Sequence, residues 1–531
     1  MSSPMLTRTA ELVRSHDRIT GSLLAVLAGA GMGLAYQPYA LWPLALGAVA
    51  LLTLLARHAG TRRSLWLGLL FGLAQGAVAI TWVSVLGWWV AVLLVAAMSV
   101  WPMAVAWVIA RTASLPAGWL FASAAWIAAE FGTANVPFGG FPWLRLVWTT
   151  VDQPMSGWLP VIGAVGTSWL VALSGQALAA LASPHPGRRY GPRTARVAAI
   201  GLLVVGFGGG AALAARPVPA GGPDVTLGVV QGNVDGTAGP RAMGYARSVT
   251  DNHVSETVTL MARARTGLDP TPDLVLWPEN STDIDPTKDA ETHLLVQLAE
   301  LVSERPILVG AVMDGPGPDE RQTASLWWTT SNQIVARYNK RNLVPFGEFV
   351  PLRSELLPLL PILKEVGAQS VPGTTPGVLT GPLADGRSLT VGTVICYELA
   401  WDTTVADTVM NGARVLVVQS NNGTYTGTGQ PQQQFAITRG RAMELQREIV
   451  VATTNSLSGL IDARGRVIDR SHEATAWARS ITVPERTGVT LGARLDPWLD
   501  WVALAVALGG LVWSFVPGSR RGTPVPVGGH R

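Results

Sequence analysis

The chain has 531 residues, of which 48% are hydrophobic and only 14% are charged. Soluble domains carry about a quarter charged residues, so the composition excludes an entirely soluble protein, and the large apolar fraction excludes a disordered one. The single cysteine excludes an internal disulfide framework and a cysteine-cluster metal site.

Eight apolar runs, most of them close to the roughly 20 residues that cross a hydrocarbon core, predict transmembrane helices. Seven of the runs lie within the first 215 residues, which is too many for the buried helices of one globular core. The predicted spans are Ile19–Tyr36, Leu41–Leu55, Leu65–Val83, Trp88–Ala110, Ala117–Phe131, Trp158–Ala182, Val197–Ala215 and Trp498–Val516.

Arginines in the short connecting segments predict the orientation of this bundle. Fourteen arginines fall on one side of the predicted topology, and only Arg145, Arg216 and Arg494 fall on the other. Because loops rich in Arg and Lys stay in the cytoplasm, both termini are expected there, and the segment before the last span is expected outside. The first span has no cleavage signal, and we interpret it as a retained helix.

The net charge of +4 divides between these two regions. Residues 217–497 carry 23 cationic and 30 acidic side chains, a net charge of −7, whereas the remaining residues carry +11. The basic residues therefore belong to loops that face anionic lipid, and the mildly acidic external domain argues against a nucleic-acid partner. We expect three parts: a seven-helix bundle (residues 1–216), an external domain (217–497), and an eighth helix with a tail (498–531).

Short β-rich runs alternate with helical patterns in residues 217–497, which is typical of a layered α/β domain with a mixed sheet. The predicted strands are Val225–Val230, Leu274–Trp277, Ile307–Val312, Leu326–Thr330, Gln333–Tyr338, Leu389–Ile395, Val415–Gln419 and Ile449–Thr454. The predicted helices are Arg247–Arg265, Thr292–Ser303, Asp402–Asn411 and Gln434–Arg447.

Three side chains with useful chemistry follow the ends of apolar runs, where α/β sites assemble: Glu279, Lys340 and Cys396. A buried carboxylate can deprotonate a thiol, and a fixed cation can stabilise both the thiolate and an oxyanion. Each residue also has a structural interpretation, as an inert buried thiol, a capping carboxylate or a solvated lysine. The chain contains no H-x-x-x-H, no G-x-S-x-G and no phosphate-binding glycine loop, and we expect no cofactor.

Longer motifs around these residues resemble the apolipoprotein N-acyltransferase family of the nitrilase superfamily. They are Leu276-Trp-Pro-Glu-Asn-Ser, Tyr338-Asn-Lys-Arg-Asn-Leu-Val-Pro-Phe-Gly-Glu-Phe-Val-Pro and Ile395-Cys-Tyr-Glu, with Gly139-Gly-Phe-Pro-Trp-Leu between two spans and Val230-Gln-Gly-Asn at the start of the external domain. The resemblance covers nearly the whole chain. It implies eight transmembrane helices and an extracytoplasmic α-β-β-α domain in a bacterial cytoplasmic membrane.

The resemblance also implies roles for single residues. Glu279 would be the general base, Cys396 the nucleophile and Lys340 the cation at the oxyanion. Glu348 would order Lys340, and Tyr397 and Glu398 match the residues that follow the family nucleophile.

The implied reaction is a ping-pong acyl transfer through a Cys396 thioester. A phospholipid would be the acyl donor, and the diacylglyceryl-cysteine of a lipoprotein would be the acceptor. We expect a monomer.

One motif departs from the family pattern, because no Trp follows Gln231-Gly-Asn. We hypothesise that the Pro-interrupted apolar stretch Leu352–Val366 is a mobile lid, with a packed surface helix as the alternative, and we interpret Arg439–Glu444 as structural.

Two rival functions share some of these features. A membrane-tethered amidase would use the same Glu, Lys and Cys but would need no eight-span bundle. A transporter would need charges within its helices, and we find only Glu130 near such a position.

Overall fold

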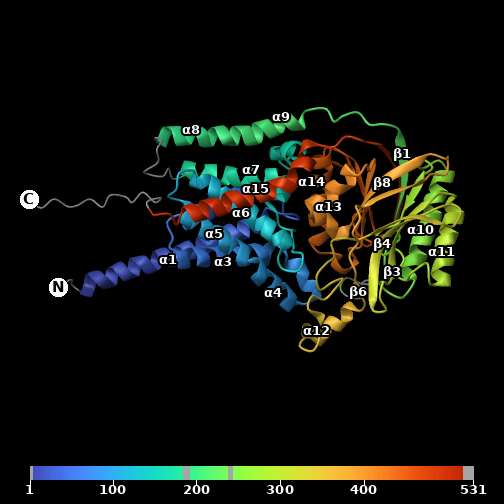
Figure 1. Ribbon diagram of the computed structural model, residues 1–531, viewed down its shortest axis with the longest axis horizontal. Helices are drawn as coiled ribbons and strands as arrows, with labels where there is room; N and C mark the ends of the chain where they lie inside the picture. Colours follow the sequence, from blue (N-terminus) through green and yellow to red (C-terminus); the bar gives the residue numbers. More distant parts are fainter. Residues whose placement is uncertain (1–3, 183–191, 237–238, 240–242, 518–531) are drawn as a thin grey trace, which may run out of the picture.

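Long apolar helices and short β-strands occupy separate parts of the molecule (Figure 1). The computed structural model describes residues 4–182, 192–236, 239 and 243–517. The helices that precede the first strand form one bundle with the last helix, α15 (Leu491–Trp513), and the α/β domain sits at one end of it. The start of α1 (Pro4–Leu34) and the end of α15 lie at the end of the bundle remote from this domain (Figure 1).

Each of the eight predicted spans overlaps a helix. Among the described residues, four helical stretches are long and apolar enough to cross a bilayer, namely Trp88–Thr112, Pro154–Ala182, Arg193–Ala214 and Leu491–Trp513. The bundle contains α2 Pro43–Ala56, α3 Thr61–Ala79, η1 Thr81–Leu86, α4 Trp88–Met98, α5 Val100–Thr112, α6 Gly118–Asn135, η2 Leu146–Thr150, η3 Pro154–Trp158, α7 Leu159–Ala182, α8 Pro192–Leu203, η4 Val204–Gly209 and α9 Gly210–Ala214.

Two mixed sheets form the α/β domain. The first has the strand order β13-β1-β2-β3-β4-β5, with β6 paired to β4, and the second has the order β12-β11-β10-β9-β8-β7. Their bounds are β1 Asp224–Gln231, β2 Leu274–Leu276, β3 Ile307–Asp314, β4 Glu320–Trp328, β5 Ile334–Asn339, β6 Gln369–Ser370, β7 Val378–Pro382, β8 Ser388–Ile395, β9 Val415–Ser420, β10 Ile449–Thr453, β11 Gly459–Ile461, β12 Val467–Arg470 and β13 Trp477–Pro484.

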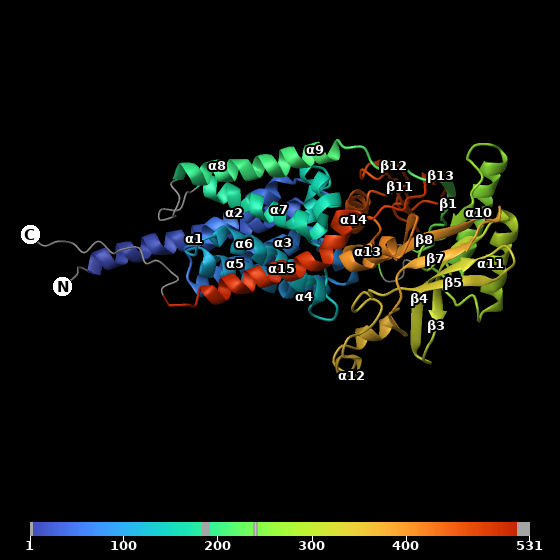
Figure 2. The same ribbon diagram turned by 45° about the horizontal axis from the view of Figure 1, so that its top comes forward.

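The two sheets face each other, and helices cover both outer faces, which gives the expected α-β-β-α order of layers (Figure 2). Aliphatic side chains from strands of both sheets, such as Leu276 and Val417, share one buried cluster. Helices α10 (Ser248–Arg265) and α11 (Ala290–Ser303) pack on the outer face of the first sheet. On the second sheet lie α13 (Asp402–Met410) and α14 (Gln430–Leu445).

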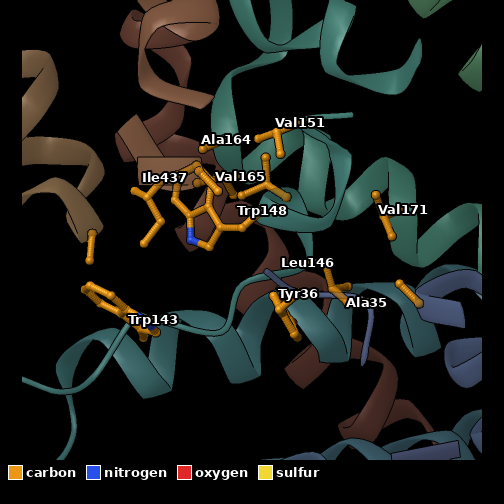
Figure 3. Packing of buried hydrophobic residues seen from close by; sticks show 14 of the residues in the cluster. Ala35, Tyr36, Trp143, Leu146, Trp148, Val151, Ala164, Val165, Val171 and Ile437 are labelled. Atoms are coloured by element: carbon orange, nitrogen blue, oxygen red, sulfur yellow. The ribbon is translucent and has the colours of Figure 1, made fainter. Parts of the chain in front are cut away.

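The second pair of helices also packs against the membrane bundle, so the domain and the bundle share one apolar core. Figure 3 shows this junction, where Trp148 of η2 lies close to Ile437 of α14 and to Val165 of α7. Gly440 permits the close approach, because a Cβ atom there would lie 2.8 Å from the Trp148 ring. The contact fixes α14 between the second sheet and the bundle.

Charged groups buried at the junction are paired with each other. Arg145 contacts Glu130 of α6 at 3.2 Å and Asp402 of α13 at 2.5 Å. Breaking one partner of such a buried pair typically costs about 3–5 kcal/mol, because the other charge stays buried without compensation. The pairs therefore fix the orientation of the domain on the bundle.

The last helix begins at Leu491, seven residues before the start of the predicted span at Trp498. The helix therefore contains Asp496 as well as Asp500, which already lies within the predicted span, so the expectation that only Glu130 lies near an intramembrane position was wrong. Asp496 has a structural partner: its carboxylate accepts the backbone N–H groups of Ala164 and Val165, just after α7 kinks at Gly163. Gly163 has a φ of 69°, and a Cβ there would lie 1.9 Å from Asp496 Oδ1.

Candidate active site

Three strand ends meet on the side of the domain that faces the bundle, and each supplies one of the predicted site residues. Glu279 follows β2, Lys340 follows β5 and Cys396 follows β8. The structure brings Lys340 Nζ within 2.7 Å of Glu279 Oε1, and the charges of both residues act on the Cys396 thiol.

Lys340 is almost completely buried between two carboxylates. Its Nζ donates to Glu279 Oε1 at 2.7 Å and to Glu348 Oε1 at 3.0 Å. Burial alone would lower the pKa of Lys340, but the two carboxylates raise it well above its ordinary value. Glu348 Oε2 in turn accepts the backbone N–H of Val344 at 2.7 Å, which ties the ammonium to the loop after β5. Lys340 is therefore a fixed cation.

Glu279 is held on both of its oxygens. While Oε1 contacts Lys340, Oε2 accepts the backbone N–H of Asn421 at 2.9 Å. The backbone reaches this position because Gly310 of β3 has no side chain: a Cβ there would lie 2.0 Å from the Pro278 oxygen. Burial raises the pKa of Glu279, with Lys340 opposing the rise. A carboxylate with a raised pKa is a stronger base, which suits proton transfer from a thiol.

Cys396 occupies a sharp turn between β8 and the short helix η6 (Cys396–Ala400). Its φ of 52° lies in the left-handed region, which a residue with a side chain adopts at a cost of about 1–3 kcal/mol. Burial first, and then the Glu279 carboxylate, raise the pKa of the Cys396 thiol to about 12, although Lys340 and Ser420 lower it. The resting sulfur is therefore protonated at neutral pH and needs a base to become a nucleophile.

Glu398 lies two residues after the thiol and holds the turn together. Its Oε2 accepts the Ile395 N–H at 2.8 Å, and its Oε1 accepts the Tyr338 hydroxyl at 2.7 Å and the Arg341 N–H at 2.6 Å. The Asn342 N–H also points at Oε1, at 3.3 Å. This one carboxylate therefore joins the end of β8, before Cys396, to the end of β5, beside Lys340.

Tyr397 connects the site to the bundle. Its hydroxyl donates to the Gly140 oxygen at 3.1 Å, and its ring stacks on Phe141 and Trp143 with centroids 6.1 and 6.0 Å apart. The motif Gly139-Gly-Phe-Pro-Trp-Leu thus lies directly against the residue that follows Cys396. Trp401 packs edge-on against the same ring, with centroids 4.5 Å apart.

A group of amides and a hydroxyl beside the thiol was not predicted from the sequence. Gln434 of α14 lies 3.9 Å from Cys396 Sγ through its Oε1 and donates to Ser420 Oγ at 2.5 Å. Asn422 and Gln430 complete the group. The signal was the polar run Gln430-Pro-Gln-Gln-Gln, of which only Gln434 falls within the predicted helix Gln434–Arg447.

Among the described residues, one group of carboxylates has the spacing of a metal site: Asp402, Glu444 and Asp496. Two of them are already paired with a cation, since Arg441 Nη1 contacts both Asp402 and Glu444 at 2.7 Å. The third accepts the backbone N–H groups described above. We therefore interpret the group as part of the junction, which agrees with the structural role predicted for Arg439–Glu444.

Three other predicted features stay predictions or fall outside the described residues. The stretch Leu352–Val366 forms the short helices α12 (Arg353–Leu356) and η5 (Pro361–Val366), with Leu359 and Ile362 exposed, and its role as a lid stays a prediction. Residues 237–238 and 240–242 of the segment without Trp, and residues 518–531 of the tail, lie outside the described residues.

Comparison with known families agrees with this architecture. The apolipoprotein N-acyltransferase N-terminal domain matches residues 28–177, and the carbon-nitrogen hydrolase domain matches residues 243–487. The fold and the matches define a membrane-associated protein with a carbon-nitrogen hydrolase domain.

Individual relatives identify the family more specifically. Apolipoprotein N-acyltransferases of Azotobacter vinelandii and Gloeobacter violaceus are each 30% identical, over 92% and 98% of this chain and over 92% and 99% of their own lengths. The Mycolicibacterium smegmatis enzyme of the same name is 33% identical, but the match spans 54% of this chain and only 46% of that protein. The chain belongs to the apolipoprotein N-acyltransferase family.

Solved structures of the nitrilase superfamily also match. Saccharomyces cerevisiae Nit3, a member of branch 10 of that superfamily, aligns with a TM-score of 0.36 and 14% identity, covering 51% of this chain and 93% of its own.

Proposed function

We propose that this chain is a bacterial cytoplasmic membrane enzyme that moves an acyl chain from a phospholipid to the α-amino group of an apolipoprotein's diacylglyceryl-cysteine. Family membership gives the reaction in outline, as N-acylation of lipoproteins. The observation that carries the mechanism is the position of Lys340 Nζ, 2.7 Å from Glu279 and 3.0 Å from Glu348, beside the Cys396 thiol.

In the first half-reaction, Glu279 takes the thiol proton as Cys396 Sγ attacks the ester carbonyl of the phospholipid. Lys340 stabilises the oxyanion that forms, and it can do so without reorganising because its position is already fixed. When the C–O bond breaks, the proton passes from Glu279 to the departing alkoxide. The products are a lysophospholipid and an acyl thioester on Cys396.

In the second half-reaction, the α-amino group of the lipoprotein attacks the thioester carbonyl. Glu279 removes one amine proton, and the thiolate leaves as the amide forms and then recovers that proton. Splitting the transfer through a thioester replaces one difficult step by two easier ones. A site held against a membrane bundle keeps two lipid-anchored substrates close to the nucleophile.

The topology belongs to the same proposal. Eight membrane helices would hold the domain outside the cytoplasm, with both termini inside and with boundaries at residues 1–216, 217–497 and 498–531. The location of the start of α1 and the end of α15, at the end of the bundle remote from the domain, supports this arrangement. A monomer would suffice, since Glu279, Lys340 and Cys396 come from one chain. The amidase alternative is not favoured, because the family relatives are acyltransferases along almost their whole length.

Cys396→Ala tests the nucleophile. In detergent micelles containing phospholipid, mass spectrometry of the whole protein should show an added acyl mass on the unchanged enzyme and none on the variant, and lysophospholipid release should stop. Because the chain has one cysteine, no other thiol can carry the acyl group. Lysophospholipid release at the original rate by Cys396→Ala would refute the mechanism.

Lys340→Met tests the cation, with Lys288→Met as the matched control. Lys288 is exposed, and its nearest carboxylate oxygen, on Asp314, is 3.9 Å away. Loss of one oxyanion donor typically slows catalysis about 100-fold to 1,000-fold, whereas the control should acylate normally. Equal rates for the two variants would contradict the role of Lys340.

A further inference from the structure

Ser420 ends the strand next to the one that carries the nucleophile. Strand β9 runs parallel to β8 with Ile395 opposite Gln419, so the residues that follow this pair, Cys396 and Ser420, lie next to each other. Ser420 is completely buried, and nothing in the Glu279, Lys340 and Cys396 mechanism requires a hydroxyl there.

The orientation of the Gln434 amide follows from its neighbours. Its Oε1 accepts from Asn422 Nδ2 at 2.8 Å and from Gln430 Nε2 at 2.9 Å, so this end of the amide must be the oxygen. The other end is then the NH₂ group, and it donates to Ser420 Oγ at 2.5 Å. All of these groups come from α14, from the end of β9 or from the loop after β9, within the same domain.

The Gln434 amide in turn restricts the direction of the Ser420 hydroxyl proton. Because the Ser420 oxygen already accepts an N–H, its own O–H must find a different acceptor. In the described part of the chain, the Ser420 hydroxyl donates to no oxygen, and the neighbouring Cys396 is the residue that the β8 and β9 register places beside it. The neighbouring Ser420 hydroxyl lowers the pKa of Cys396, against the larger effect of burial.

We propose that Ser420 is a further catalytic residue, oriented by Gln434, whose hydroxyl donates a hydrogen bond to the Cys396 sulfur whenever that sulfur is negatively charged. The proposal rests on the function proposed above and deepens it. In the resting thiol, the S–H proton instead points to Gln434 Oε1, 3.9 Å away. Ser420 therefore acts twice per cycle, first when the thiolate forms and again when it leaves the thioester.

A neutral donor is chemically suited to this position. The thiolate already has Lys340 as a cation, but that ammonium is shared with Glu279 and Glu348. A hydroxyl adds stabilisation of the thiolate without another charge, and the buried site strengthens any hydrogen bond to it. Gln434 is the positioning residue, since it acts on the sulfur mainly through Ser420.

The test measures the reactivity of the only thiol in full-length protein in micelles, without any lipid substrate. Iodoacetamide at fixed pH alkylates Cys396, and mass spectrometry of the whole protein follows the rate. The variants are Ser420→Ala, Gln434→Glu and the control Gln432→Met. Gln432 lies on the same helix but donates to Glu473 at 2.9 Å, away from the thiol.

Removal of the donor should raise the pKa of the thiol, so Ser420→Ala should be alkylated about threefold to tenfold more slowly, after allowing for the greater intrinsic nucleophilicity of a more basic thiolate. Gln434→Glu should be slowed further, because the introduced carboxylate attracts the Ser420 proton and repels the thiolate. Gln432→Met should react at the original rate. In acyl transfer, Ser420→Ala should lower kcat and leave KM for phospholipid unchanged.

An alkylation rate for Ser420→Ala equal to that of the unchanged protein overturns the proposal, as does equal slowing by Gln432→Met. A folding defect is recognised separately by the thermal unfolding temperature of each variant. Alkylation needs no substrate, so the two proposals can fail separately. Slow alkylation of Ser420→Ala, together with no lysophospholipid release by the unchanged enzyme, would support the role of Ser420 and refute the proposed reaction.

Discussion

Replacing Glu398 by glutamine should abolish most of the activity while leaving the protein folded. Glu398 does not touch the reacting sulfur, but its two oxygens hold the backbone on both sides of the site. In Glu398→Gln, the single oxygen will face the three donors that converge on Oε1, because that choice keeps more bonds. The NH₂ group then faces the Ile395 N–H, where the carboxylate now accepts at 2.8 Å.

The cost follows from these contacts. A buried N–H left opposite another donor costs about 1–3 kcal/mol. The hydrogen bonds to the remaining oxygen also weaken when the carboxylate becomes a neutral amide, but removal of a buried charge offsets part of that loss. We therefore expect a loss of about 1–3 kcal/mol in stability, which lowers the unfolding temperature by several degrees. The Ile395 N–H directly precedes Cys396, and a displacement of about 1 Å at a nucleophile can cost about 100-fold in rate.

The rate of acyl-enzyme formation is the decisive measurement. Mass spectrometry of the whole protein should show the acyl adduct of Glu398→Gln forming about 100-fold more slowly than that of the unchanged enzyme. Tyr338→Phe is the matched control, because it removes one donor and leaves the Arg341 and Asn342 N–H groups on Oε1; its rate should fall less than about tenfold. A rate for Glu398→Gln within threefold of the unchanged enzyme would refute the reasoning.

Two further predictions concern the junction and the thiol. Gln433→Leu should destabilise the protein by at least about 3 kcal/mol, because the Gln433 side chain accepts from the indole N–H groups of Trp82 and Trp143 and donates to two backbone carbonyls of the bundle; an unchanged unfolding temperature in a thermal scan would argue against this. Because burial and the Glu279 carboxylate raise the pKa of Cys396 to about 12, its alkylation rate should climb about tenfold per unit from about pH 7 to pH 10. A plateau near pH 8.5, the ordinary value for a thiol, would show that the pKa is not raised.

The buried strands of the domain could be predicted because each is a continuous run of mostly apolar residues in the sequence. Val415–Ser420 is buried at every position, and the predicted strand differs from it by one residue. Strand β13 was missed, because Trp477–Pro484 mixes buried and exposed residues and includes Arg479. It pairs along its whole length with β1, more than 240 residues earlier, and no local pattern encodes a contact of that range.

The site likewise combines residues that a local sequence pattern reveals with contacts that no local pattern encodes. Glu279, Lys340 and Cys396 could be named because each follows a recognisable apolar run and lies within a specific motif. Glu348, Tyr397 and Glu398 were named through the family motifs. The contacts of Glu398 could not be predicted, since it acts mainly through backbone N–H groups that every sequence possesses. Glutamines at positions 430, 433 and 434 look like a solvated helix start, yet all three are buried. Their burial is imposed by the bundle and the second sheet, which become neighbours only in the folded chain.

Adjacent positions on an α-helix point about 100° apart, so Gln433 and Gln434 face different surroundings from one turn of α14. The first is hydrogen-bonded to the membrane bundle, and the second lies against the nucleophile and Ser420. The orientation of the site therefore depends on the bundle as well as on the domain. A chimera that carried this domain on the helices of another protein would keep every reacting residue. It would lose the contacts with the bundle that orient α14 beside the nucleophile.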